Sequence, residues 1–156
     1  PNVRMVLLKG LSDKGFVFYT NFESRKGNEL KNNQKASMCF HWKSIRRQIR
    51  VIGKVEQVTD KEADEYFNSR PYKNRIGAWA SSQSKVLDKR ENFLKKIKEF
   101  EKKYPDEKKV PRPPHWSGWR VLPTEIEFWL DVEGRVHERL NYRNDHGKWT
   151  KELLYP

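Results

Sequence analysis

Apolar and polar residues alternate along two segments in the first half of the chain, and this pattern predicts half-buried β-strands. In Ala36–Trp42 every second residue is apolar, and Gln48–Val55 alternates in a similar way. Two further strands are expected nearer the N-terminus. Val3–Leu8 is a short apolar run typical of a largely buried strand. Phe16–Thr20 follows a turn at Asp13–Gly15, so these two strands are expected to form a hairpin.

Other segments have apolar residues three or four positions apart or carry helix-capping residues, and these predict helices. A short helix is expected over Ser24–Asn32, with its first residue as the N-cap. Thr59–Glu62 has the spacing of a capping box, and Arg70, which precedes a proline, should end that helix. A longer helix is expected at Asp88–Lys103, and its apolar stripe is interpreted as core packing. The proline-rich residues 110–114 should form a rigid extended connector.

The last third of the chain is rich in strand signals. Aromatic and β-branched residues are concentrated in four short segments, Trp119–Leu122, Ile126–Leu130, Val136–Tyr142 and Trp149–Leu154. Turn residues at Asp131–Gly134 and Asn144–Gly147 separate the last three. Six or seven short antiparallel strands with a few helices indicate a mainly β, α+β fold, built as a small barrel with helical additions. The 156 residues are expected to form one domain.

Composition narrows the class of protein. Aromatic residues make up 13% of the chain, which argues against disorder despite a low hydrophobic content of 35%. No apolar run approaches the roughly 18–20 residues that would span a membrane, so no membrane association is expected. A single cysteine, Cys39, excludes an internal disulfide framework and favours the cytoplasm. Because the sequence begins at Pro1 and its first residues already have a strand pattern, we expect a preceding N-terminal segment.

The net charge of +12, from 33 basic and 21 acidic residues, indicates a polyanionic or phosphorylated ligand. The densest basic cluster, in Lys85–Lys109, is interleaved with acidic residues, which is typical of a solvated helix face. The sequence shows neither zinc-finger spacing nor an RNA-binding aromatic motif. Small phosphorylated ligands are therefore favoured over nucleic acid. A basic nucleic-acid-binding module remains an alternative, which predicts a steep salt dependence of binding.

Several standard catalytic patterns are missing from the sequence. No nucleophile–histidine arrangement can be assembled, the four histidines lack metal-ligand spacing, and there is no glycine-rich phosphate loop. We therefore expect no metal site.

Three other groups of residues suit phosphate. Ser24, Arg25 and Lys26 stand where a helix begins, and free N–H groups and the helix dipole favour an anion there, although simple N-capping explains them equally well. Tyr66 and Arg70 lie one helical turn apart and could grip a phosphate together.

The third group is Arg135, His137 and Arg139. On a strand these side chains would project to one face, where three potential cations favour an anionic ligand. The competing interpretation is a solvent-facing strand with Glu127 and Glu138 as ion-pair partners.

Nine segments, taken together and in order, are similar to the pyridoxamine (pyridoxine) 5′-phosphate oxidase family. The resemblance covers nearly the whole chain. The segments are Arg4–Lys9, Phe18–Asn21, Ser24–Lys26, Arg47–Gln48, Tyr66–Pro71, Ile76–Trp79, Ser82–Ser84, Trp116–Trp119 and Ile126–Trp129 followed by Arg135–Arg139. Each is weak alone, but their common order is specific.

The resemblance implies an antiparallel FMN-binding split β-barrel, homodimeric, with FMN at the subunit interface. Residues implied to hold FMN are Arg4, Met5, Val6, Leu7, Leu8, Lys9, Tyr19, Thr20, Ser24, Arg25, Lys26, Gln48, Gln83, Ser84, Trp129 and Arg139, several of them across the interface. Residues implied to bind the substrate are Lys9, Tyr66, Arg70, Asn74, Arg135 and His137, the last two lying over the pyridine ring and serving catalysis. Residues 115–156 would complete the site.

The implied reaction oxidises pyridoxamine 5′-phosphate or pyridoxine 5′-phosphate to pyridoxal 5′-phosphate. A hydride equivalent moves to the flavin, and O2 reoxidises the flavin and gives H2O2. We expect Arg135 and His137 to orient the substrate, without a covalent protein nucleophile.

The sequence departs from the family pattern at three places. Leu130 follows the Phe-Trp pair where the family usually has Gln, Asn74 stands where Ser is common, and the chain ends in Leu153–Pro156 without the usual Arg. Two alternatives remain open at this point. One is a related split-barrel flavoprotein such as a flavin reductase, and the other is a catalytically weak protein that binds FMN or pyridoxal phosphate.

Overall fold

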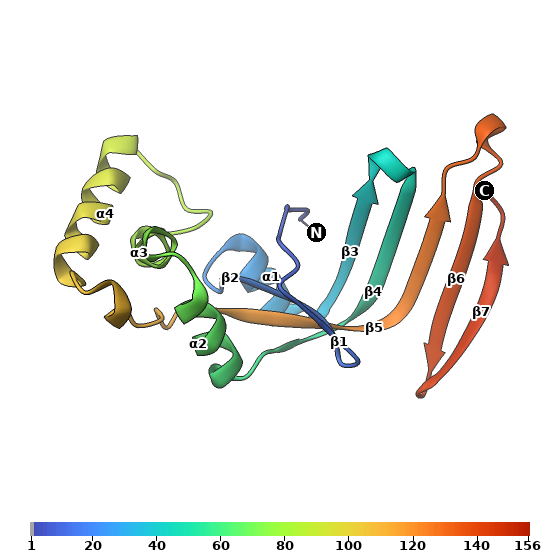
Figure 1. Cartoon of the computed structure of the whole chain (residues 1–156), viewed down its shortest axis with the longest axis horizontal. Coiled ribbons are helices and arrows are strands. Elements are labelled where there is room, and N and C mark those ends of the chain that lie inside the picture. The colour runs from blue at the N-terminus through green and yellow to red at the C-terminus, as the bar shows by residue number, and fades with distance from the viewer. Residues whose placement is uncertain (1) are drawn as a thin grey trace. The chain divides into compact units, whose positions relative to one another are not determined.

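The computed structural model describes residues 2–156 and contains four α-helices and seven strands within them. In chain order these are β1 (Gly10–Ser12), β2 (Gly15–Asn21), α1 (Arg25–Asn32), β3 (Lys35–Trp42), β4 (Arg47–Gln57), α2 (Asp60–Ser69), α3 (Tyr72–Ala80), α4 (Arg90–Lys103), β5 (Trp116–Leu130), β6 (Glu138–Asp145) and β7 (Lys148–Leu154). Short 3-10 helices lie at Lys43–Ile45, Glu107–Lys109 and Glu133–Arg135. The expected α+β composition is confirmed (Figure 1).

The described chain divides into two compact units, each considered by itself below. The helical unit comprises residues 2–9, 17–33 and 57–119, and the sheet unit comprises residues 10–16, 34–56 and 120–156. Strands β2 and β5 contribute residues to both.

The core of the helical unit is aromatic. Phe67, Ile76, Val110 and Trp116 are buried together, and partly buried side chains surround them, namely Tyr19, Tyr66, Tyr72, Ala78, Trp79, Ile97, Phe100 and Tyr104. Tyr19 stacks between Tyr66 and Trp116, with ring centroids 4.1 and 5.2 Å away. This stack joins β2, α2 and the start of β5, so the side chains at the C-terminal end of α2 are held firmly.

Helix α2 begins and ends as its sequence predicts. The Thr59 side chain accepts a hydrogen bond from Glu62 N, and the Glu62 carboxylate accepts one from Thr59 N. Near the same end of the helix, Arg112 contacts Asp60 and Asp64, and it donates to the Trp116 carbonyl at 2.9 Å. This clamp fixes the extended connector, residues 110–114, against α2.

Helix α3 was not expected from the sequence. It follows directly on the Arg70-Pro71 pair that was expected only to end α2, and Pro71 is its N-cap residue. Proline fixes φ near the helical value and needs no donor at a helix start, so one dipeptide ends one helix and begins the next. Helix α4 begins at Arg90, two residues after the expected start, and its expected apolar stripe is partly buried except at Leu94, which is 43% exposed.

The sheet unit is organised around the long strand β5. The hydrogen-bonded order is β1-β2-β5-β4-β3, and β6 pairs with both β5 and β7 (Figure 1). Strands β3 and β4 are antiparallel, with Ala36 opposite Gly53 and Trp42 opposite Arg47. A Cβ atom at Gly53 would lie 2.0 Å from the Leu122 carbonyl oxygen, so β4 can approach β5 this closely only where it has no side chain.

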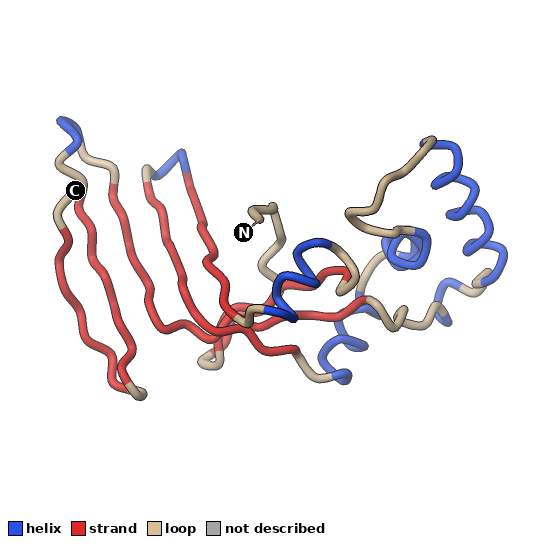
Figure 2. The backbone as a smooth tube through the Cα atoms, turned by 180° about the vertical axis from the view of Figure 1, so that it is seen from behind, coloured by secondary structure: helices blue, strands red, loops and turns tan. Residues whose placement is uncertain are grey.

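Three expectations for strands are wrong. Val3–Leu8 is an irregular segment, and the first strand begins only at Gly10 (Figure 2). Met5 is 98% exposed, so the apolar run has no core to enter within the described chain. The segments expected at 119–122 and 126–130 are one strand, β5, because Pro123 does not interrupt it and pairing with β6 starts just beyond, at Glu125.

The third correction concerns Arg135, His137 and Arg139, which do not share one strand. Gly134 and Arg135 have φ of 71° and 62°, and these left-handed conformations turn the chain before β6 begins at Glu138. Only Arg139 lies on a strand. The other turn in this region, at Asn144–Gly147, is confirmed, with His146 and Gly147 also at positive φ.

Candidate functional site

A cavity of about 570 Å³ in the helical unit is lined by an unbalanced set of charges. We call it the cationic cavity. Its basic lining residues are Arg4, Lys9, Lys26, Arg70 and Lys73, and no Asp or Glu of the described chain lines it. The remaining lining residues are Met5, Val6, Leu7, Tyr19, Thr20, Asn21, Tyr66, Asn74, Gly77, Ala78, Ser81, Gln83, Phe93 and Trp116. Five cations without a carboxylate repel one another, so the cavity favours a multiply charged anion.

One part of this cavity is formed where β2 leads into α1. Ser24 is the N-cap: its hydroxyl accepts from Gly27 N at 3.1 Å and donates to the Asn21 carbonyl at 2.7 Å. The close turn requires Gly27, because a Cβ atom there would lie 2.4 Å from the Phe22 carbonyl oxygen. The turn thereby fixes the start of α1, from which Lys26 lines the cavity.

The Lys26 ammonium is hydrogen-bonded to a hydroxyl group and not to a carboxylate. Its Nζ donates to Thr20 Oγ1, and that hydroxyl donates to Gln83 Oε1 at 3.2 Å. Burial, and secondarily the positive charge of Arg4, lowers the pKa of the Lys26 ammonium from 10.5 to about 8. An anion bound beside Lys26 would restore the charged form.

The end of α2 and the first turn of α3 contribute a second group of cavity residues. The Arg70 guanidinium lies over the Trp116 ring, 4.8 Å from its centroid, and Lys9 Nζ lies 5.8 Å from the Tyr66 centroid. Arg70 Nη1 is buried and has no hydrogen-bond partner among residues 2–156. Burial lowers the pKa of this guanidinium, and Arg75 adds to the effect while Tyr66 opposes it. A buried N–H without a partner is costly and indicates a missing acceptor.

A second cavity, of about 780 Å³, lies in the sheet unit. It is mostly apolar and is lined by Trp42, Ile45, Arg47, Gln48, Ile49, Phe128, Trp129, Leu130, His137, Glu138, Arg139, Leu140, Leu153 and Leu154. We call it the apolar cavity. Several of these side chains are largely exposed, among them Leu153 at 82% and Ile45 at 61%. Such an exposed apolar surface is typical of an interface with another molecule.

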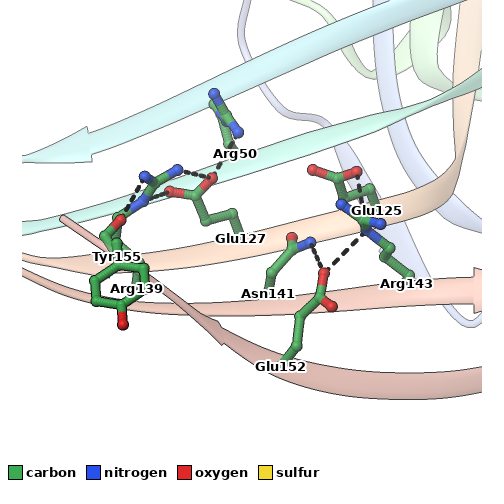
Figure 3. A network of polar contacts seen from close by, with 8 residues as sticks. All are labelled: Arg50, Glu125, Glu127, Arg139, Asn141, Arg143, Glu152 and Tyr155. Atoms are coloured by element: carbon green, nitrogen blue, oxygen red, sulfur yellow. Dashed lines mark hydrogen bonds and ion pairs between the residues drawn. The ribbon is translucent and has the colours of Figure 1, made fainter.

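Arg139 is held by a polar network on β4, β5 and β6 (Figure 3). Its Nε and Nη2 donate to the two carboxylate oxygens of Glu127 at 2.9 and 3.1 Å, and its Nη1 donates to the Tyr155 carbonyl at 2.9 Å. Arg50 Nη2 also donates to Glu127, at 2.5 Å. The hydrogen bond from Arg139 is the main cause that lowers the pKa of Glu127, against the opposing effect of burial. Glu127 was proposed as an ion-pair partner from the sequence, and this is confirmed for Arg139.

His137 and Arg135 differ in their surroundings. His137 lines the apolar cavity, with its ring 4.7 Å from that of Trp129. Its Nδ1 accepts from Val132 N at 3.2 Å and lies 3.2 Å from an Asp131 carboxylate oxygen. Arg135 is exposed in the turn before β6 and lines neither cavity.

Most of the residues that the sequence predicts at the site line one of the two cavities. The cationic cavity holds Arg4, Met5, Val6, Leu7, Lys9, Tyr19, Thr20, Lys26, Tyr66, Arg70, Asn74 and Gln83, and the apolar cavity holds Gln48, Trp129, His137 and Arg139. Leu8, Ser24, Arg25, Ser84 and Arg135 line neither. Sequence reasoning missed Lys73, which could have been found from its place beside Asn74 in the sequence.

Among residues 2–156, no group of three His, Cys, Asp or Glu side chains could hold a metal ion. No helix in the described part of the chain is long and apolar enough to cross a membrane.

Comparisons with known proteins decide the family. A family model described as "Pyridoxamine 5'-phosphate oxidase" matches residues 1–104, and one described as "Pyridoxine 5'-phosphate oxidase C-terminal dimerisation region" matches residues 116–156. The chain belongs to the pyridoxamine 5′-phosphate oxidase family. The resemblance inferred from the nine sequence segments is therefore confirmed.

Curated relatives carry the same description over the full chain. The pyridoxine/pyridoxamine 5′-phosphate oxidase of Pelagibacter ubique is 60% identical and that of Agrobacterium fabrum is 54% identical; the match covers 100% of this chain and 76% of each relative.

Solved structures confirm the fold. PhzG from Burkholderia lata, in complex with tetrahydrophenazine-1-carboxylic acid, superposes with a TM-score of 0.90 at 31% identity, covering 98% of this chain and 74% of that one. A pyridoxamine 5′-phosphate oxidase-related, FMN-binding protein from Nostoc punctiforme gives a TM-score of 0.75 at 17% identity, covering 98% of this chain and 80% of that one. The expected split-barrel fold class is correct.

Proposed function

We propose that this protein is an FMN-dependent oxidase that converts pyridoxamine 5′-phosphate or pyridoxine 5′-phosphate to pyridoxal 5′-phosphate and reduces O2 to H2O2. The observation that carries the proposal is the cationic cavity, with five cations and no carboxylate among its described lining residues, in a chain of this family. Cofactor and substrate each bring a phosphate dianion, so the charge of the cavity matches the pair. The exposed, single Cys39 accords with a cytoplasmic enzyme.

The residues present fit FMN. The buried Nη1 of Arg70 without a partner and the lowered pKa of Lys26 both indicate that the cavity is completed by an anion. Among the cavity residues, Lys26 and Arg4 would bind the cofactor phosphate, and 5–7, Lys9, Tyr19, Thr20 and Gln83 would bind the flavin ring. The family resemblance adds Ser24 and Arg25 for the phosphate and Leu8 and Ser84 for the ring, although these four do not line the cavity. FMN, when bound, accepts a hydride equivalent and passes its electrons to O2.

We further propose a homodimer in which Gln48, Trp129 and Arg139 complete the flavin site across the subunit interface. The C-terminal match to a dimerisation region and the exposed side chains of the apolar cavity support this arrangement. Trp129 offers an aromatic surface to the ring and Arg139 offers N–H donors to its polar edge. Residues 115–156 thus serve both as interface and as part of the site.

The substrate phosphate would be bound by Lys9, Tyr66, Arg70 and Asn74. Arg70 is preorganised for this by its contact with Trp116, and its buried N–H supplies the unpaired donor. The His137 ring is held at Nδ1, which lies 3.2 Å from both Val132 N and an Asp131 carboxylate oxygen, and it would present Nε2 to the substrate. Arg135 would close over the pyridine ring from its exposed turn.

The oxidation needs no covalent bond between the substrate and a nucleophile of the protein. The substrate C4′–H bond breaks with its electron pair, and the amine or alcohol loses a proton. An alcohol yields the aldehyde directly, whereas an amine yields an imine that water hydrolyses to aldehyde and ammonia. The residues of this chain bind the phosphate and orient C4′, and the released proton passes to water.

An anaerobic half-reaction tests the function. The purified protein is loaded with FMN, excess flavin is removed, and pyridoxamine 5′-phosphate is added without O2. Bleaching of the flavin absorption band, followed by its return and H2O2 formation when air is admitted, is the expected result. A bound flavin that stays oxidised would mean a binding protein or a different substrate, and failure to bind FMN would reject the proposal entirely.

Arg135→Ala tests the substrate assignment. We expect turnover at saturating substrate to fall by about tenfold or more, because the ring is no longer held over the reacting position. Full turnover in this variant would show that Arg135 does not orient the substrate.

A further inference from the structure

We propose that Glu127 is a positioning residue for Arg139: by holding one side of the guanidinium it directs the remaining N–H groups of Arg139 to the cofactor. The inference rests on the proposed function, because it assumes that Arg139 contacts FMN. Glu127 itself is not expected to touch the cofactor. Its effect would be exerted through the orientation of Arg139.

The hydrogen bonds around Arg139 define this role. A guanidinium has five N–H donors. Glu127 accepts from Nε and Nη2 of Arg139 at 2.9 and 3.1 Å, and the Tyr155 carbonyl accepts from Nη1 at 2.9 Å. One N–H therefore remains on each terminal nitrogen, and the planar group cannot turn without breaking the paired bonds to Glu127.

The Glu127 carboxylate is buried, which suits it to hold Arg139 in one orientation. It is 3% exposed, although it lies on the same strand as largely exposed residues such as Phe128, at 42%. Its carboxylate balances two cations at once, Arg139 and Arg50. In Glu127→Gln the negative charge between the two guanidinium groups is lost, and their repulsion would turn Arg139 away.

The same sheet face provides a matched control. Glu125 lies two residues before Glu127, and Figure 3 shows it in the neighbouring half of the network with Arg143, Asn141 and Glu152. Its carboxylate lies 3.8 Å from Arg143 Nε and forms no ion pair with Arg139. Glu125→Gln therefore makes the same chemical change on the same strand while leaving Arg139 in place.

The experiment measures FMN affinity by quenching of flavin fluorescence on binding to the apoprotein. Wild type, Glu127→Gln, Glu125→Gln, Arg139→Gln and the double variant Glu127→Gln/Arg139→Gln are compared, each with its thermal midpoint without FMN. We expect Glu127→Gln to raise the FMN dissociation constant about tenfold and Glu125→Gln to change it less than about twofold. The double variant should bind FMN as Arg139→Gln does, within about twofold, because both changes remove one interaction.

The possible outcomes distinguish a failure of the positioning role of Glu127 from a failure of the proposed function. If wild type binds no FMN, the proposed function fails. If wild type binds FMN but the effects of Glu127→Gln and Arg139→Gln multiply in the double variant, or if Glu125→Gln weakens binding as much as Glu127→Gln, the positioning role is rejected. Should Glu127→Gln not fold, Glu127→Asp replaces it, since it keeps the charge and withdraws the carboxylate. Weakened FMN binding is again expected, and unchanged affinity in that variant would also reject the role.

Discussion

At the scale of single residues, Lys26 best shows how the fold prepares a charge for a ligand. Its ammonium is buried beside Arg4 and bonded to Thr20, so its pKa is lowered to about 8. Below about pH 8 the ammonium is charged in both the folded and the unfolded chain, where the pKa is near 10.5, and its burial then destabilises the folded apoprotein. The buried Lys26 ammonium thus strengthens the binding of an anion and lowers the stability of the apoprotein.

Replacing Lys26 separates these two effects. For Lys26→Met we expect the FMN dissociation constant to rise at least about tenfold, since a charge-assisted contact is lost. The thermal midpoint of the apoprotein should not fall, because the variant no longer buries a charge. Fluorescence titration and thermal unfolding of the same preparations check both results, and a lower midpoint with unchanged FMN affinity would contradict them.

The affinity for FMN should also depend on pH. The Lys26 ammonium is present below about pH 8 and is lost as the pH rises through that value. A bound dianion raises this pKa, so the dissociation constant for FMN should increase progressively between about pH 8 and pH 10. Lys26→Met serves as the control, in which this part of the pH dependence should disappear. A flat wild-type profile over this range would argue against a phosphate beside Lys26.

Individual site residues were predictable from the sequence to different degrees. Lys26 and Arg70 were predicted because each stands at a helix terminus that local capping signals identify. Arg135 was placed on a strand wrongly, since the left-handed conformation that it shares with Gly134 leaves no periodic signal. The contact between Glu127 and Arg50 joins residues 77 positions apart, which no local pattern reveals.

At the scale of elements, alanine substitutions at two helical glycines should change the free energy of unfolding in opposite directions. Gly27→Ala should displace the start of α1, because the new Cβ atom would lie 2.4 Å from the Phe22 carbonyl oxygen. Gly77→Ala, in α3, meets no atom within 4 Å. We expect Gly27→Ala to lower the free energy of unfolding by about 2 kcal/mol or more and Gly77→Ala to raise it by up to about 1 kcal/mol.

Urea denaturation of the two apoproteins measures these changes. Gly27→Ala should in addition weaken FMN binding, because Ser24 and Lys26 move with the helix start. If Gly27→Ala were as stable as wild type, the α1 turn would be able to relax and the argument for its rigidity would be wrong.

Elements defined by local signals were predicted well from the sequence, and those that need distant partners were not. Helices α1 and α2 carry their own caps, and β3 and β4 carry their own alternation. The apolar run Val3–Leu8 has the composition of a strand but no strand pairs with it in the described chain. Helix α3 was missed because the proline before it was interpreted only as an end to α2.

At the scale of the whole molecule, the proposed dimer depends on the apolar side chains of the sheet unit. Leu153 on β7 is 82% exposed and lines the apolar cavity. Leu153→Asp should shift the protein from dimer to monomer in analytical ultracentrifugation and weaken FMN binding by about tenfold or more, since a buried charge opposes association. Thr150→Asp, on the same strand, introduces the same charge outside that cavity and should leave both unchanged. A dimer that survives Leu153→Asp would place the interface elsewhere.

The excess of positive charge in the cationic cavity has a practical consequence for anyone who handles the empty protein. Arg4, Lys26 and Arg70 have no carboxylate beside them in the cavity lining, and common buffer anions such as phosphate and sulfate supply the missing negative charge. At about 100 times its own dissociation constant such an anion would stabilise the apoprotein by about 2.7 kcal/mol and raise the apparent FMN dissociation constant about hundredfold. A melting temperature that rises with phosphate but not with chloride at equal ionic strength would reveal this occupancy. The buffer is thus a competing ligand, and affinities for this protein should be compared only between solutions of the same anion content.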